Sequence, residues 1–445
     1  MRRYRLAWLL GLIALAAGSG PALAFGGMYV AKADSRLFNQ TSKVVLARHD
    51  GKTVITMVSD YQGALEEFAV VVPVPSVLER GQIHVSDGAI VDRLGAYTAP
   101  RLVRPFDGDP CRAAVGEDAR AAPAARHGAT DALGVSVDAT YAVGEYDVVI
   151  LAAEDSDGLA GWLRGNGYRL PDGAEEVLAD YIARGMRFFV ARVNLEEQSK
   201  LGYSYLRPLQ MAFESEDFAL PIRLGMANAA EPQELLVYLL TREGRSEVVN
   251  YPTKAMPADV ELPLFVADDF ARFYRALFEA EAAATGGTTV FLEYAGEMSR
   301  CAPCAAEPLS PDELRELGVF WLLDSDQAAS AAAAPEVFVT RLRLRYDAAR
   351  FAEDLRLRES GDRSGFQLSY TLREPWRGEP RCEAARDYLI ALPARFEAEA
   401  QSLARLTRWP IAEIRARMEA SGQPFALPQL LAAERRWWER LWPEN

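Results

Sequence analysis

The stretch Phe68-Ala69-Val70-Val71-Val72-Pro73-Val74-Pro75 decides the fold of this 445-residue chain. A continuous apolar run of this length, rich in β-branched valines, is typical of a strand that is buried on both faces. Prolines end the run, because proline lacks the backbone N–H group that a central strand must donate. We therefore expect this stretch to form the centre of a first β-sheet.

Strand-like runs lie on both sides of it. Residues 44–47 and 53–58 are apolar and β-branched, and Asp50-Gly51 between them suits the tight turn of a β-hairpin. In the run 337–346, apolar residues alternate with Phe, Thr and three Arg residues, which predicts a half-exposed strand. Further strands are expected at residues 146–151, 187–195, 209–213, 218–226, 235–241 and 289–294.

Helices are expected between and after these strands. Helical spacing of apolar residues indicates helices that start near Ser156 or Asp157, that cover residues 174–184 and 268–284, and that follow residue 383 to the C-terminus. The predicted fold class is therefore α+β, with mixed β-sheets, peripheral helices and a helical C-terminal region. A faint echo of the pattern at residues 68–75 near residues 218–224 leaves open a duplication of two related halves.

The chain divides into four expected segments. Residues 1–24 read as a signal peptide, residues 25–250 as a mixed-sheet region with a solvated loop at 112–132, residues 251–382 as a second α+β region, and residues 383–445 as a helical C-terminal region.

The N-terminus has the three parts of an export signal. Arginines 2, 3 and 5 precede a short apolar run, and Ala22-Leu23-Ala24 is a small-residue cleavage site, so the mature chain is expected to begin after Ala24, at Phe25. The apolar run is too short to span a membrane, and no cysteine follows the cleavage site for lipid attachment. We therefore expect a soluble periplasmic or secreted protein with no membrane span once the signal is removed.

Charge narrows the possible partners. The chain has 49 basic and 63 acidic residues. Removal of the signal takes away three arginines and no acid, leaving 46 minus 63, or −17. Such a surface repels nucleic acid and anionic lipid, so neither is an expected partner.

The four cysteines are Cys111, Cys301, Cys304 and Cys382, an even number in a chain expected to reach an oxidising compartment. They are disulfide candidates, and chain entropy favours long-range bridges without fixing the pairing. Cys301-Ala302-Pro303-Cys304 could instead shuttle between dithiol and disulfide, but proline residues delay the next helix and weaken that hypothesis. Zinc binding by the four thiolates is a lesser alternative.

No catalytic or cofactor motif stands out. The three histidines have no nucleophile motif beside them, and the paired carboxylates at 66–67, 175–176 and 268–269 are too common to be specific. We therefore expect no cofactor, no metal and no catalytic residue, and the sequence leans away from an enzyme.

The C-terminal tail is rich in tryptophan. Trp437, Trp438 and Trp442 share one face of a predicted helix, whose other face mixes charges of both signs. Docking of this helix on the protein's own core is the expected role, and a partner surface or a membrane interface is the alternative.

Several short motifs together resemble a known family. They include Tyr61-Gln62-Gly63, the run 68–76, Gly144-Glu145-Tyr146-Asp147, the segment 162–168, Cys301 with Cys304, and Thr340-Arg341-Leu342 followed by Arg345-Tyr346. They resemble the bacterial family called domain of unknown function 2330 over nearly the whole mature chain. The resemblance implies an exported bacterial protein with no assigned activity. Family members commonly begin with Cys-Gly-Gly where this chain has Phe25-Gly26-Gly27, so Cys111 could lack its usual partner.

The sequence thus favours a non-enzymatic binding or structural protein that binds an unknown envelope component. The alternative is a periplasmic enzyme, either a thiol-disulfide oxidoreductase at Cys301 and Cys304 or a carboxylate-based hydrolase. One structural feature would favour a ligand site: convergence of the strand end at 73–75 with the segment 162–168 on one concave pocket.

Overall fold

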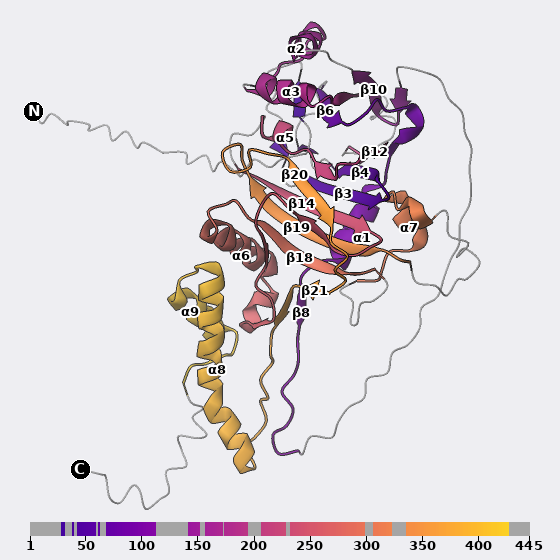
Figure 1. Ribbon diagram of the computed structural model, residues 1–445. Helices are drawn as coiled ribbons and strands as arrows, with labels where there is room; N and C mark the ends of the chain where they lie inside the picture. The colour runs from indigo at the N-terminus through magenta and orange to yellow at the C-terminus, as the bar shows by residue number, and fades with distance from the viewer. Residues whose placement is uncertain are drawn as a thin grey trace, which may run out of the picture.

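The fold is known from a computed structural model of the whole chain, shown in Figure 1. Its mixed sheets and surrounding helices confirm the α+β class. The structure describes residues 28–31, 38–39, 42–58, 61–62, 68–112, 141–151, 156–171, 173–194, 206–227, 232–298, 306–322 and 335–426.

A nine-stranded mixed sheet forms the centre of the molecule. Its strand order is β16-β18-β19-β14-β3-β4-β12-β7, with β21 also paired to β18. The predicted hairpin is confirmed as β3 and β4, with Asp50 and Gly51 at positive φ in the turn. The sheet continues across residue 250, where one region was expected to end. The strands are β3 Ser42–His49, β4 Lys52–Val58, β7 Ile83–Val85, β12 Leu209–Glu214, β14 Gln233–Thr241, β16 Thr253–Ala255, β18 Val290–Glu297, β19 Phe338–Tyr346 and β21 Phe366–Gln367.

A five-stranded sheet contains the decisive apolar stretch as β6. The predicted strand is confirmed, and its valines face two cores, with Val70 and Val72 on one side and Val71 on the other. The expectation that it is central is wrong, because β11 holds the middle of the order β1-β6-β11-β10-β9. These strands are β1 Met28–Ala31, β6 Phe68–Val74, β9 Tyr141–Val143, β10 Tyr146–Leu151 and β11 Arg187–Val193.

The two sheets stack face to face, and their inner faces share the largest apolar core. Val70 and Phe189 of the smaller sheet belong to the same cluster as Leu46, Ile55 and Val237 of the larger one. Burial of this contiguous apolar surface is the main stabilising term of such a sandwich.

Helices cover the outer faces of both sheets (Figure 1). On the smaller sheet, α2, α3 and α5 pack against residues such as Val71 and Phe188. On the larger sheet, α1, α7 and a 3₁₀ turn, η3, pack against residues such as Val45 and Tyr238. The bounds are α1 Gly88–Tyr97, α2 Ser156–Gly165, α3 Ala174–Ala183, α5 Arg223–Ala227, α7 Pro311–Glu316 and η3 Phe320–Leu322.

The strand expected at 218–226 is mostly wrong. Only β13, Ala219–Leu220, is a strand, and the chain then turns at Pro221 into the short helix α5. Its apolar residues are buried although they are not in a strand: Leu220 and Ile222 join the inter-sheet core and Leu224 packs under α3. The echo of residues 68–75 seen in the sequence depended on this strand.

The helical pattern predicted from residue 383 is confirmed as far as residue 420, by α8 and α9. These two helices share an apolar core with α6. Three smaller sheets complete the described structure, in the orders β13-β20-β15, β17-β22-β8 and β2-β5. The remaining bounds are α6 Phe270–Ala284, α8 Glu383–Thr407, α9 Ile411–Ala420, β2 Phe38–Asn39, β5 Tyr61–Gln62, β8 Arg101–Val103, β15 Ser246–Val248, β17 Val260–Glu261, β20 Leu355–Glu359, β22 Ser369–Thr371, η1 Arg80–Gln82 and η2 Leu264–Ala267.

Strand β19 corrects another expectation. The sequence predicts one exposed face, yet Arg341 and Arg343 are 5% and 9% exposed. Helix α6 covers this face, and the Arg343 guanidinium lies over the ring of Phe278 at 3.9 Å. The alternation was identified correctly, but the charged face is an interior one because acidic partners from two neighbouring strands accompany it.

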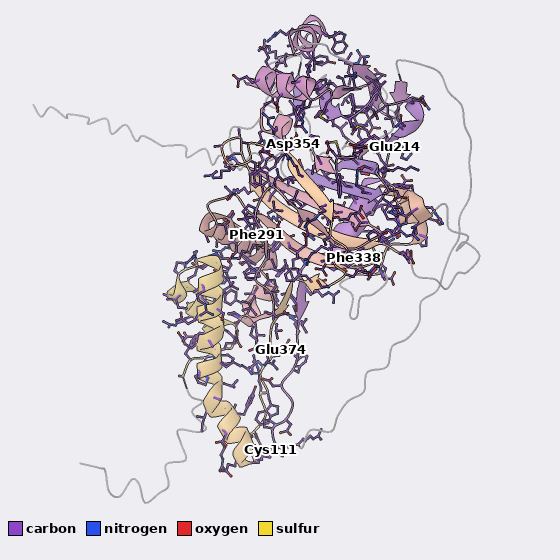
Figure 2. The ribbon with its side chains drawn as sticks, in the orientation of Figure 1. Cys111, Glu214, Phe291, Phe338, Asp354 and Glu374 are labelled. Atoms are coloured by element: carbon purple, nitrogen blue, oxygen red, sulfur yellow. A yellow bond between two sulfur atoms is a disulfide. The ribbon has the colours of Figure 1, made fainter. Side chains whose placement is uncertain are left out.

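A disulfide joins Cys111 to Cys382 across 271 positions, with the two Cα atoms 5.9 Å apart. It closes an arm that leads from β8 and β22 to the start of α8, where Figure 2 labels Cys111. A long-range bridge is what chain entropy favours, and Cys111 has a partner here. Several predicted features lie outside the described residues: the signal with Ala24 and Phe25, all but the first residue of the loop expected at 112–132, Cys301, Cys304, Trp437, Trp438 and Trp442.

Within the described part of the chain, no helix is long and apolar enough to cross a membrane.

A single buried carboxylate ties the C-terminal helices together. Glu399 on α8 is 2% exposed and accepts a hydrogen bond from the Gln423 side chain at 2.7 Å. The Gln423 oxygen in turn accepts one from the N–H group of Leu264 on η2. Burial raises the pKa of Glu399 to about 7, although the Gln423 hydrogen bond and the charge of Arg395 lower it in part.

Glu399 therefore predicts a pH-dependent stability. The folded protein holds this proton more tightly than the unfolded chain, so the free energy of unfolding should fall as pH rises from about 4.5 to about 7, then level off. Urea unfolding of the wild type and of Glu399→Gln at several pH values measures it. Gln cannot titrate and resembles the protonated acid, so the free energy of unfolding of Glu399→Gln should rise relative to that of the wild type between about pH 4.5 and about pH 7. Above about pH 7 the difference should stay constant, and a difference that does not change between about pH 4.5 and about pH 7 would contradict the assignment.

Candidate functional site

The strongest candidate site is a cavity between the two stacked sheets. Its first part has a volume of about 380 Å³. Ile55 of β4, Phe213 of β12 and the end of β6 from Val72 to Pro75 form its apolar wall, so we name it the apolar lobe. Strand β1 pairs with β6 only as far as Val71, and the prolines follow where that neighbour has ended. The lobe opens where β6 is no longer flanked on both sides.

A second, charged lobe of about 700 Å³ adjoins the first. The two lobes share Arg184, Asp217, Ala219 and Asp354. The wall of the charged lobe comes from the C-terminal end of α3, the turn before β13, and the start of β20. The cavity therefore has an apolar wall at one end only, and charged side chains line its junction and its other end. Its volume is in the range of small-molecule sites.

Asp354 holds the junction of the lobes together. Its Oδ1 atom accepts hydrogen bonds from the Tyr181 hydroxyl at 2.5 Å and from the Ile222 N–H group at 3.0 Å. Its Oδ2 atom accepts one from Arg184 at 2.8 Å. Figure 2 shows Asp354 where the smaller sheet's helices meet the central sheet. One carboxylate thus joins α3, the turn before α5 and β20.

The charge of Asp354 helps to raise the pKa values of its two neighbours Tyr181 and Arg184. Burial, together with the negative charge of Asp354, raises the pKa of Tyr181 far above its usual value. Burial would lower the pKa of Arg184, but the hydrogen bond and charge of Asp354 outweigh it and the pKa is raised. Tyr181 therefore stays a neutral donor and Arg184 a cation. Because all three donors are directed at its two oxygens, Asp354 serves as an acceptor that positions the wall rather than as a proton donor.

The charged lobe has more carboxylates than cations. Its three arginines each have an acid: Arg184 pairs with Asp354, Arg223 with Asp180, and Arg356 with Glu353. Glu216 and Asp217 also line this lobe, and neither carboxylate makes an ion pair within the ranges that the structure describes. Arg48 donates to the backbone oxygens of Ser215 and Glu216, and the charge of Asp217 acts on it from a longer distance. The local excess is therefore negative.

Only one of the two segments that would mark a ligand site lines this cavity. The strand end at 73–75 does so, whereas the segment 162–168 does not. Leu163 of α2 and Tyr168 pack instead in the core on the opposite face of the smaller sheet, together with α3.

The carboxylate pairs and histidines considered from sequence are dispersed. Asp269 at the start of α6 pairs with Arg272 and Arg417, which is a structural role. His84 on β7 pairs with Glu316 at 3.2 Å, and this hydrogen bond raises the pKa of His84. Neither lies in the cavity. Among the residues with described positions, no group of three or more potential ligands is placed to hold a metal ion.

Apart from the strand end at 73–75, the residues that line the cavity were not identified from the sequence, and for Asp354 the sequence holds no local signal. It follows an unremarkable stretch, and its role depends on Tyr181 more than 170 positions away. The proline-terminated end of β6 was the one detectable signal, since Pro73 and Pro75 both line the apolar lobe.

The fold and cavity define an α+β protein of two stacked sheets with a mixed-polarity site between them. The chain belongs to the bacterial family described as uncharacterized protein conserved in bacteria (DUF2330), whose model matches residues 20–358. The matched range includes every residue that lines either lobe, but stops before Cys382, α8 and α9, so it is shorter than the sequence resemblance implied. No curated protein and no solved structure matches the chain.

Proposed function

We propose that this protein is exported from the bacterial cytoplasm and acts in the envelope as a non-enzymatic binding protein. Its ligand is an amphipathic molecule with an apolar end and a positively charged end, bound between the two sheets. The observation that supports this is the change of the cavity wall from apolar to acidic across its four shared residues.

The two ends of the ligand have separate recognition elements. An alkyl or aryl group would fit against Ile55, Phe213 and β6 in the apolar lobe, where each buried CH₂ contributes about 0.8 kcal/mol. A protonated amine would lie near Glu216 and Asp217, the two carboxylates of the charged lobe without an ion pair in the described structure. The net charge of 46 minus 63, or −17, once the signal is removed adds a long-range attraction for cations.

Binding is favoured over hydrolysis because Asp354, the carboxylate at the junction of the lobes, accepts hydrogen bonds and is not placed to donate a proton. A hydrolase of the two-carboxylate type needs one acid that gives up a proton. Asp354 instead accepts from Tyr181, Ile222 and Arg184, and holds the fold of the wall. The thiol hypothesis rests on Cys301 and Cys304, which lie outside the described residues.

Octylamine, octanol and octanoate form a matched set of probes for this site. Calorimetric titration of the full-length product should show saturable binding of octylamine and binding of octanoate weaker by at least about tenfold, because like charges repel in the charged lobe. The double variant Glu216→Gln/Asp217→Asn should lose most of this preference, whereas Ala219→Trp, at the junction of the lobes, should weaken all three probes.

Glu214→Gln is the control, because Glu214 is an exposed carboxylate close in sequence that does not line either lobe (Figure 2). Octanoate binding as tightly as octylamine would contradict the proposed charge preference. The protein is best purified from the envelope fraction, where intact mass should show Phe25 as the first residue. Recovery only from the cytoplasm with residues 1–24 attached would contradict export.

A further inference from the structure

A second, smaller cavity lies beside the end of β19, at the C-terminal end of α6. It has a volume of about 410 Å³. Its lining is small or basic: Pro232, Ala282, Ala283, Gly286, Gly287, Arg345 and Arg350, with Glu279 on the rim helix α6. It shares no lining residue with the two-lobed cavity between the sheets.

The positive charge in this cavity arises because β19 has more arginines on one face than there are carboxylates paired with them. Arg341, Arg343 and Arg345 alternate along one face of the strand, and two carboxylates serve the first two. Glu293 lies 2.8 Å from Arg341, and Glu234 lies 2.6 Å from Arg343. In the strand register Glu234 is directly opposite Arg345, yet its carboxylate is directed to Arg343. Arg345 is therefore left without an acid among the residues that the structure describes.

Arg345 is consequently an unused cation. Its Nε atom is buried without a hydrogen-bond acceptor, and no ion pair to Arg345 occurs in the part of the chain that the structure describes. A buried guanidinium N–H group without an acceptor destabilises the folded protein. A ligand that supplies the missing acceptor removes this cost and gains affinity. Glu279 lines the same cavity, but it is exposed and makes no ion pair with Arg345 within the described residues.

The rest of the cavity leaves room for an anion. Arg350 contributes a second guanidinium, oriented by its ion pair with Asp347. Gly287 has a φ of +76°, and a Cβ atom there would lie 2.9 Å from the Arg350 side chain. Gly287 thus allows Arg350 to lie across the turn, and with Gly286, Ala282 and Ala283 it keeps that wall free of large side chains.

We propose that this cavity binds a phosphate group, with Arg345 as its principal ligand and Arg350 as a second contact. Two guanidinium groups from different elements can donate to different oxygens of one tetrahedral anion, and guanidinium forms its strongest hydrogen bonds with phosphate and carboxylate. The site is separate from the cavity proposed for the cationic ligand, so either assignment can fail without the other.

Inorganic phosphate is the probe for this site. Calorimetric titration of phosphate into the full-length protein at constant ionic strength should show saturable binding at millimolar concentrations or below. Arg345→Gln should weaken it by at least about tenfold, and Glu279→Gln should strengthen it because a competing carboxylate is removed. Arg358→Gln is the matched control, since Arg358 is an exposed arginine paired with Glu247 away from this cavity.

A stability measurement separates a ligand from a structural arginine. Without phosphate, Arg345→Gln should unfold at the same urea concentration as the wild type or a higher one, because no acid loses its partner. With phosphate, only the wild type should gain stability. The proposal is overturned if the wild type shows no saturable binding, if acetate binds as tightly as phosphate, or if Arg345→Gln binds phosphate as the control does.

Discussion

Replacing Asp354 with alanine is expected to lower the free energy of unfolding by about 3 to 5 kcal/mol, because it leaves two buried donors without an acceptor. The Tyr181 hydroxyl and the Ile222 N–H group both donate to the same Asp354 oxygen, and Tyr181 is fully buried. Arg184 loses its carboxylate as well. Urea unfolding followed by circular dichroism measures the cost.

Two further variants make this prediction specific. Asp354→Asn keeps an oxygen that can accept from Tyr181 and Ile222 but removes the charge beside Arg184, so it should cost less than the alanine variant. Glu353→Gln changes the adjacent carboxylate, which makes two exposed contacts, an ion pair with Arg356 at 3.2 Å and a long hydrogen bond from Asn250 at 3.5 Å, and it should cost less than about 1 kcal/mol. Equal costs for Asp354→Ala and Glu353→Gln would show that Asp354 does not hold the cavity wall.

The fold was predictable where local pattern and burial coincide. The β6 run and the Asp-Gly hairpin were both identified because each is specified by adjacent residues, through β-branched apolar side chains and a turn that needs positive φ. The stacking of β6 and the hairpin in different sheets was not predictable, since strand order depends on pairings such as β3 with β14, which are about 190 positions apart.

Residues 218–226 and β19 show the limits of periodicity. At residues 218–226 a proline turn and a short helix bury the same apolar residues that a strand would bury. On β19 the predicted alternation of apolar and charged residues was correct. The arginine face is nevertheless buried, because Glu293 and Glu234 neutralise Arg341 and Arg343. The candidate site shares this limit, because Glu216, Asp217 and Asp354 become one acidic wall only through tertiary contacts.

Glu293, which neutralises two of the arginines on β19, is the second position where a substitution should greatly lower the stability. This residue is fully buried and contacts both arginines, Arg341 at 2.8 Å and Arg343 at 3.8 Å, and it accepts a hydrogen bond from the Tyr274 hydroxyl. It occupies a β-bulge in β18, where the register with β19 shifts between Leu292 and Tyr294. The extra residue lets the Glu293 side chain point to the arginine face beside its neighbour Tyr294.

Glu293→Ala should therefore lower the free energy of unfolding by about 3 to 5 kcal/mol, because two buried guanidinium groups are left with the single carboxylate of Glu234. Glu293→Gln should cost less, since its amide oxygen still accepts from Tyr274. Glu336→Gln, which breaks an exposed pair with Arg242, is the control and should cost less than about 1 kcal/mol. Urea unfolding at one pH compares all three.

A double-mutant cycle tests whether Glu293 acts through the arginines. If its role is to neutralise Arg341, then Glu293→Ala/Arg341→Met should cost less than the sum of its two single variants, because the double variant leaves neither charge without its partner. Additive costs would mean that the two side chains stabilise the sheet independently. The expected coupling also explains how three arginines can line an interior strand: the first two need Glu293 and Glu234, and only Arg345, next to a cavity, can do without an acid of its own.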